Sequence, residues 1–122
     1  MNKRQTGACW EEAVACYLKR AGVEIREQNF RSSQGEIDII GYHQDCLVFF
    51  EVKYRKNDSF GSPAEAVDIK KQRAICRCAD YYMYRHGISQ DTAVRFDVVA
   101  VCGEKMEWFQ NAFEYRRAGR RG

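Results

Sequence analysis

Two apolar segments that each contain at least one acidic residue, joined by a short polar turn, constrain the fold of this chain more than any other feature. Residues 35–40 read GEIDII and residues 47–55 read LVFFEVKYR. β-Branched and aromatic residues favour strands, and the mostly polar residues 41–46 between the segments favour a turn. The pattern therefore predicts an antiparallel hairpin within a sheet.

The position of the turn decides which side chains of the hairpin lie opposite each other. Centring it on residues 44–45 places Asp38 opposite Glu51, and Glu36 opposite Lys53. The Cβ atoms of directly opposed residues lie about 4.5–5.5 Å apart, and like charges placed in this way repel. A positive group is therefore expected between Asp38 and Glu51.

The other face of the same hairpin is apolar. The register pairs Ile37 with Val52 and Ile39 with Phe50, so this face is predicted to be the core side. The central turn pair, Gln-Asp, is not among those that favour two-residue hairpins. A loop of odd length stays open as an alternative, and it would turn the contact between the two acids into a diagonal one.

Two carboxylates and a lysine at this place predict a metal site for phosphodiester chemistry. A partly buried carboxylate costs kilocalories unless a cation or hydrogen-bond donors compensate it. Mg²⁺, or Mn²⁺ in its place, is expected to bind Asp38, Glu51 and the carbonyl oxygen of Val52. An exposed strand end, with Glu51 and Lys53 facing water, is the alternative, and the alignment of Asp38 with Glu51 favours the metal site over it.

Length and composition predict one soluble domain. The chain has 122 residues, of which 45% are hydrophobic and 30% charged, so residues 1–115 are expected to form a single core and residues 116–122 a basic tail. The N-terminal residues contain no apolar signal core, and no apolar run approaches the roughly 20 residues of a membrane span. We therefore expect a cytoplasmic protein without a membrane segment, whose six cysteines are reduced and mostly buried.

The remaining periodicity predicts two helices and three further strands. Helices are expected over residues 8–21 and from Ser62, as N-cap, to about His86, with strands at 23–31, 94–101 and 106–109. The order of elements indicates an α/β fold, a mixed five-stranded sheet with helices packed against it. The long helix suits a crossover between two parallel strands.

Charged residues on the two predicted helices suggest further site residues. Glu11 lies at the edge of the apolar stripe of the first helix and could reach a site on the sheet, or it could be an ordinary first-turn acid favoured by the helix dipole. Lys70, Lys71 and Arg73 on the second helix, with Arg55 at the end of the preceding strand, suit contacts to the phosphates of nucleic acid. A solvated helix face is the alternative for the basic cluster.

The chain resembles the bacterial YraN family over nearly its whole length, up to residue 113. The segments that carry the resemblance stand in the same order in both; they are residues 10–12, 17–18, 29–31, 35–40, 47–55, 60–67, 71–72 and 95–99. That family is similar to archaeal Holliday junction resolvases and to the PD-(D/E)xK nuclease superfamily, which implies a restriction-endonuclease-like fold and an endonuclease activity. The resemblance also implies DNA, branched or structured, as the substrate, and by analogy with the resolvases a homodimer.

Carried over by residue, the resemblance implies that Asp38 and Glu51 bind the metal ion, that Lys53 is the catalytic lysine and that Glu11 is a helix-borne acid of the site. Two other functions remain open. The chain could be a nucleic-acid-binding module that keeps a nuclease-like scaffold without turnover. It could also be a structural protein in which the charged groups form a buried ion network, but this alternative explains the two opposed acids least well, because they repel each other without a cation.

Overall fold

The computed structural model describes residues 3–55 and 67–116, and it describes side chains of the first helix from Trp10 onward. Two helices and five strands lie within these residues; they are α1 (Lys3–Arg20), β1 (Glu24–Ser32), β2 (Gly35–His43), β3 (Cys46–Arg55), α2 (Ile69–Arg85), β4 (Val94–Cys102) and β5 (Lys105–Phe113). The strands form one sheet in the order β1-β2-β3-β4-β5. The predicted mixed α/β fold is therefore confirmed.

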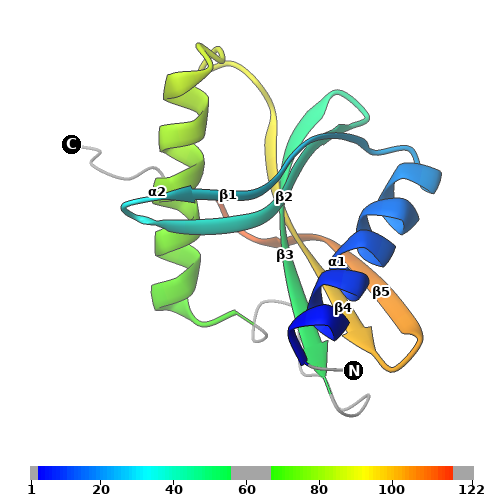
Figure 1. Cartoon of the computed structure of the whole chain (residues 1–122). Coiled ribbons are helices and arrows are strands. Elements are labelled where there is room, and N and C mark those ends of the chain that lie inside the picture. The colour runs from blue at the N-terminus through cyan, green and yellow to red at the C-terminus, as the bar shows by residue number, and fades with distance from the viewer. Residues whose placement is uncertain (1–2, 56–66, 117–122) are drawn as a thin grey trace.

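The sheet is antiparallel except for the β3–β4 pair, which is parallel. Helix α2 connects these two strands, as expected for a crossover. Figure 1 shows the twisted sheet between the two helices, with α2 on one side and α1 on the other. Both faces of the sheet are consequently covered, and each has its own core.

Each helix packs its apolar side chains onto one of these cores. On the α2 side, Ile75 belongs to a buried cluster with Phe49 and Phe96. On the α1 side, Leu18 belongs to a second cluster with Phe50. Adjacent residues of β3 thus alternate between two apolar environments, which explains why this strand is a continuous apolar run rather than an alternating one.

The register predicted for the hairpin is confirmed from its turn up to the pair Ile39–Phe50. Gln44 and Asp45 form the two-residue turn with φ of 51° and 65°. Two-residue hairpin turns of this hand match the twist of the flanking strands, although such φ values are uncommon for residues other than glycine. The open alternative of an odd-length loop is therefore wrong.

The prediction of a single core face on this hairpin is wrong. Ile39 and Val52 are buried on the α1 side of the sheet, whereas Ile37 is buried on the α2 side. Two residues that are two apart on a regular strand share a face, so β2 changes its orientation at Asp38. The physical reason for the wrong prediction is that helices cover both faces, and either face accepts an apolar side chain.

Helix α2 begins later than predicted. Residues 62–65, which we expected to form its first turn, lie outside the described residues. The helix starts at Ile69, and Asp68 caps it in an extended conformation, accepting a hydrogen bond from the Lys71 N–H at 2.8 Å. An aspartate side chain that satisfies a free N–H group of the first turn fixes a helix start. The predicted end is confirmed, because His86 is the C-cap and Gly87 follows with φ of 60°.

A buried carboxylate of β4 pairs with an arginine of its own strand and accepts hydrogen bonds from β5. Asp97 is fully buried and accepts hydrogen bonds from the Arg95 guanidinium (Nη2 at 2.9 Å), from Trp108 Nε1 (2.8 Å) and from the backbone N–H of Asn111 (2.8 Å). The β4–β5 register shifts between Phe96 and Val98, beside this carboxylate. Asp97 is therefore a structural residue, consistent with its absence from the predicted site.

None of the cysteines whose side chains the structure describes forms a disulfide. Cys76 and Cys78 are buried, whereas Cys16 is exposed and the other two are half-buried, so the expectation of mostly buried thiols holds only in part. No helix within residues 3–55 and 67–116 is long and apolar enough to cross a membrane.

Candidate active site

The site is built where β2 separates from β3. The ladder between the two strands ends at the pair Ile39–Phe50. At the next residue the Asp38 side chain turns toward β3, and its Oδ2 accepts the backbone N–H of Val52 at 2.7 Å. A carboxylate oxygen thus takes a backbone hydrogen bond of β3, which holds Asp38 beside Glu51.

Glu51 is the buried acid of the site, with 6% of its surface exposed. It extends from β3 toward α2 and meets two lysines there. Its Oε2 lies 3.6 Å from Lys53 Nζ and 3.5 Å from Lys71 Nζ. Lys53 shares a strand face with Glu51 because the two are two residues apart, whereas Lys71 comes from the first turn of α2. Both cations reduce the cost of burying the Glu51 carboxylate.

Asp38 is the acid whose protonation the site changes most. Burial and the negative charge of Glu51 raise the pKa of Asp38 from 3.8 to about 7. A side-chain hydrogen bond with Glu51 and the charge of Glu36 also raise this pKa, while the Val52 N–H lowers it. Two carboxyl groups in contact cannot both ionise readily without a cation. The raised pKa therefore marks a place where added positive charge would be stabilised.

The expected pairing of Glu36 with Lys53 is wrong. Glu36 lies opposite Arg31 in the β1–β2 ladder, and its Oε2 is 3.3 Å from Arg31 Nε. The ladder between β2 and β3 has ended before this point, so Glu36 is turned away from its predicted partner. Glu36 does not reach Lys53 because β2 separates from β3 after Ile39. The same separation ends the predicted hairpin register at Ile39.

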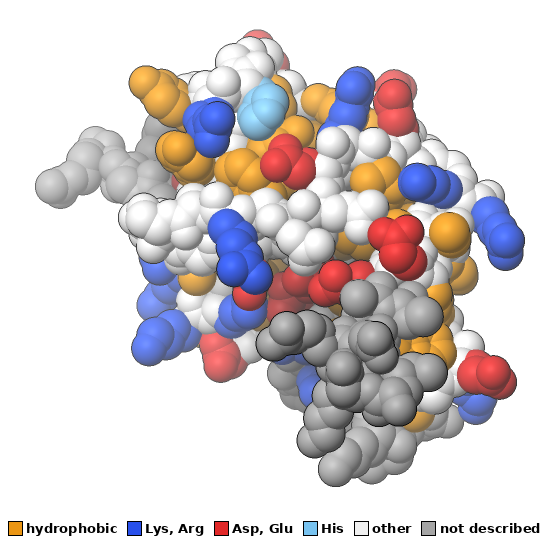
Figure 2. All heavy atoms as spheres, in the orientation of Figure 1, with side chains coloured by type: hydrophobic (Ala, Val, Ile, Leu, Met, Phe, Trp, Pro, Cys, Tyr) orange, Lys and Arg blue, Asp and Glu red, His pale blue; other side chains and the backbone are white. Residues whose placement is uncertain are grey.

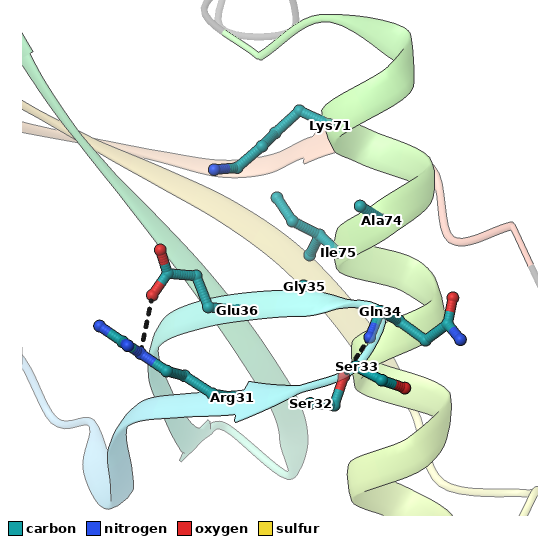
Figure 3. Close-up of a pocket in the computed structure, with 9 residues that line it drawn as sticks. All are labelled: Arg31, Ser32, Ser33, Gln34, Gly35, Glu36, Lys71, Ala74 and Ile75. Atoms are coloured by element: carbon teal, nitrogen blue, oxygen red, sulfur yellow. Dashed lines mark hydrogen bonds and ion pairs between the residues drawn. The ribbon is translucent and has the colours of Figure 1, made fainter.

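An open pocket of about 440 Å³ adjoins the site between the β1–β2 turn and α2. Figure 3 shows Lys71 extending from α2 over this pocket, with Glu36 and its partner Arg31 at the opposite wall. The turn residue Gln34 is held to α2 by Arg77, whose Nε donates to Gln34 Oε1 at 2.9 Å. Lys71 thus borders both the pocket and the Glu51 carboxylate.

Glu11 lies near the site on the α1 side. Its Oε1 is 3.5 Å from Asn29 Nδ2 of β1. Burial raises the pKa of Tyr54, and the charges of Glu11 and Asp38 raise it further, so both acids act on the same hydroxyl. However, among the residues that the structure describes, no three His, Cys, Asp or Glu side chains are grouped closely enough to hold a metal ion. The role of Glu11 stays a prediction.

The residues present fit a hard divalent cation. Mg²⁺ keeps several waters and is held in proteins by one or two carboxylates together with substrate phosphates. Asp38, held on the Val52 N–H, and Glu51, the residue before Val52, supply two carboxylates on neighbouring strands, so a third protein acid is not required. The Val52 N–H is bound to Asp38, which fixes this peptide at the site, and the role of its carbonyl oxygen stays a prediction.

Basic side chains lie beside the acids. Figure 2 shows Lys and Arg side chains over the lower half of α2, next to carboxylates at the centre of the same face. Lys70 and Arg73 are exposed on this helix, and Arg55 is half-buried at the end of β3. Their predicted contact with phosphates stays a prediction.

Lys71 differs from its sequence-based assignment, because the structure places it against Glu51. We predicted a phosphate contact for it, as for its neighbours on α2. A signal was present in the sequence, since Lys71 stands four residues before Ile75 and seven before Cys78, on the face of α2 that packs inward. A lysine in an apolar helical stripe indicates a buried or half-buried acid as its partner.

Comparison with known proteins identifies a family. The family model described as "Uncharacterised protein family UPF0102" matches residues 10–101. A UPF0102 protein of Lachnoclostridium phytofermentans is 42% identical over 114 residues, which cover 93% of this chain and 97% of the relative. Another, of Photobacterium profundum, is 43% identical over 91% of each chain, and one of Yersinia pseudotuberculosis is 40% identical over 93% of this chain and 97% of its own. The chain therefore belongs to the UPF0102 family.

Proposed function

We propose that this protein is a Mg²⁺- or Mn²⁺-dependent endonuclease with a restriction-endonuclease-like fold. The observation that carries the proposal is the hydrogen bond from the Val52 N–H to Asp38, which holds this carboxylate beside the buried Glu51 where β2 leaves β3, with Lys53 next to Glu51. The mixed five-stranded sheet, covered by a helix on each face, is compatible with that architecture.

Asp38 and Glu51 would hold the cation, together with the Val52 carbonyl oxygen, water and a phosphate oxygen of the substrate. A bound divalent cation supplies Lewis-acid polarisation of the phosphoryl group and lowers the pKa of coordinated water. Lys53, whose ammonium group lies 3.6 Å from Glu51 Oε2, is placed to orient the attacking water. It also offsets negative charge that develops on the phosphorane-like transition state.

In this proposal Lys71 pairs with Glu51 in the metal-free protein and with a substrate phosphate when the cation is bound. In the structure its ammonium group and that of Lys53 share one oxygen of Glu51. A cation held by Glu51 would repel the like charge of Lys71, so the Lys71 side chain would turn away from the acid. Lys71 also lines the neighbouring pocket, so its released ammonium group is within reach of a phosphate seated there.

The substrate that the site supports best is nucleic acid, DNA in the first instance. Lys70 and Arg73 are exposed on α2 and Arg55 ends β3, and such side chains are suited to phosphates, contacts that position a strand without reading its sequence. Binding is therefore expected to weaken steeply as the salt concentration rises.

Cleavage assays with matched variants test the proposal. Labelled branched, duplex and single-stranded DNA, and RNA, are incubated with protein and Mg²⁺ or Mn²⁺. Activity of the wild type that is lost in Asp38→Asn and in Lys53→Ala, and kept in Lys19→Ala, supports the enzyme. Lys19 is a suitable control because it is an exposed lysine at the end of α1. Activity that persists in Asp38→Asn, or absence of cleavage with every substrate, contradicts it.

The second candidate function is a nucleic-acid-binding module without turnover, and one observation favours it. Glu51 has two lysine partners in the structure, so its charge is compensated without a metal ion. In this case calorimetry detects no binding of Mg²⁺ or Mn²⁺, whereas binding of nucleic acid remains and is sensitive to salt. The enzyme requires metal binding that Asp38→Asn weakens.

A further inference from the structure

The outer face of α2 carries a continuous stripe of basic and aromatic side chains. At 100° per residue, its members fall within one third of the helix circumference. They are Lys70, Arg73, Arg77, Tyr81, Tyr84 and Arg85, and we call this set the α2 stripe. The stripe extends about 21 Å along the helix axis from Lys70 to Tyr84, at 1.5 Å per residue.

Charge on the helix is strongly one-sided. Helix α2 contains five Lys and Arg residues and a single acid, Asp80. That acid is already engaged, because the Tyr115 hydroxyl donates a hydrogen bond to it. A helix face with four cations and no acid of its own is complementary to a polyanion.

The aromatic members are unusually exposed. Tyr84 has 83% of its surface exposed and Tyr81 has 41%. The Tyr81 ring lies 6.1 Å from the Phe30 ring, and the Arg85 guanidinium lies 5.8 Å from the centre of the Tyr81 ring. Tyrosine normally buries most of its ring, so two exposed tyrosines one helical turn apart suggest a binding surface.

The stripe also borders the pocket beside the proposed active site. Arg77, in the middle of the stripe, donates to Gln34 in the wall of that pocket. Lys71, one residue after the first member of the stripe, lines the pocket and contacts Glu51. A strand that follows the stripe therefore arrives at the acids.

We propose that the α2 stripe binds single-stranded nucleic acid, with the backbone along its cations and unpaired bases stacked on Tyr84 and Tyr81. Surfaces that bind single strands combine a basic track with aromatic rings on which bases stack, and stacking needs bases that are not paired. A duplex would offer only its phosphates. This inference rests on the proposed function for its substrate class, and it adds that the strand presented to the active site is unpaired.

Fluorescence anisotropy in EDTA tests the stripe separately from any cleavage. The probes are a labelled 20-nucleotide oligothymidylate and a duplex of the same length. Loss of one stacked base costs roughly 5-fold to 150-fold in affinity, so Tyr84→Ala is expected to weaken binding of the single strand in this range and to leave the duplex unchanged. Tyr84→Phe keeps the ring and is expected to bind like the wild type. Arg73→Ala is expected to remove about one phosphate contact. The slope of log K against log[salt] for the single strand should then become less steep by about 0.7.

The controls separate loss of binding from loss of folding. Tyr84 is so exposed that its replacement should leave the thermal midpoint unchanged, and Lys19→Ala on α1 gives the effect of removing a charge elsewhere. Equal binding by Tyr84→Ala and wild type, or a preference for the duplex, overturns the inference. The two proposals can fail independently. Tyr84-dependent binding without any cleavage would contradict the endonuclease and support single-strand binding by the α2 stripe. Cleavage of duplex only, at a rate that does not depend on Tyr84, would support the endonuclease and contradict single-strand binding by the stripe.

Discussion

Lys71 reaches from the first turn of α2 to the buried carboxylate of Glu51, with its Nζ 3.5 Å from Oε2. This contact joins the helix to the proposed active site across the face of the sheet. It also gives Glu51 a second cation in addition to Lys53, which is 3.6 Å away. The position of α2 and the charge balance of the site are therefore linked.

Replacing Lys71 with methionine should destabilise the metal-free protein modestly. The change removes one of two cations from a buried acid, but Lys71 is 40% exposed in its side chain, so solvent screens the pair and the loss is about 1 kcal/mol rather than that of a fully buried pair. Urea denaturation in EDTA measures the loss. Lys70→Met, the same change on the adjacent exposed lysine, is the matched control, and an equal loss in both variants would refute a specific contact with Glu51.

The pH dependence of stability should differ between the wild type and Asp38→Asn. The pKa of Asp38 is raised in the folded protein, from 3.8 to about 7, so the folded state binds the proton more tightly than the unfolded state. This contribution to stability is complete below about pH 4 and is lost as the pH rises through 7. In the Asp38→Asn variant the side-chain amide keeps an acceptor for the Val52 N–H and cannot ionise.

In metal-free buffer the stability of Asp38→Asn relative to that of the wild type should therefore increase between pH 4 and pH 8. Each unit of pKa shift corresponds to about 1.4 kcal/mol, so the difference in unfolding free energy between the two proteins should change by a few kcal/mol at most. Other carboxylates titrate in both proteins, and their effects cancel in this difference. A difference that stays constant over this range would show that Asp38 is not held in a raised-pKa environment.

Mg²⁺ should stabilise the wild type and should fail to stabilise Glu51→Gln. A ligand that binds only the folded state raises stability in proportion to the logarithm of its concentration once sites are filled. Thermal melts at increasing Mg²⁺ detect this as a rising midpoint. NaCl at the same ionic strength is the control for screening, and Lys19→Ala is the control for the loss of a remote charge. An equal rise of the midpoint with Mg²⁺ in wild type and in Glu51→Gln would mean that Glu51 does not bind the ion.

The hairpin shows how far the sequence alone determines the site. Register follows from the turn position, and the prediction was correct up to Ile39 because a regular ladder transmits register from residue to residue. At Asp38 a side chain replaces the backbone as the acceptor of Val52. Strand register alone does not predict such a replacement. For this reason the register pairs Glu36 with Lys53, whereas in the structure Glu36 pairs with Arg31.

The start of α2 shows a second limit. Ser62 and Asp68 are both good N-cap residues, and local propensity does not choose between two caps six residues apart. The choice matters because Lys71, in the first turn after Asp68, is the residue that contacts Glu51. Tertiary packing of the apolar face of α2 determines which side chains of that turn reach the sheet.

Asp97 should be a stability residue with no part in metal binding. Its carboxylate is fully buried and compensates Arg95, whose side chain is only 14% exposed. Asp97→Ala leaves that guanidinium without its acid and also removes the acceptor of Trp108 Nε1 and of the Asn111 N–H. Breaking a buried pair in this way costs about 3–5 kcal/mol, which thermal and urea denaturation should detect as a large loss. At temperatures where Asp97→Ala is still folded, calorimetry should find the same Mg²⁺ affinity as for the wild type, because Asp97 and Glu51 point to opposite faces of the sheet. A loss of Mg²⁺ affinity as large as that of Asp38→Asn would instead place Asp97 in the site.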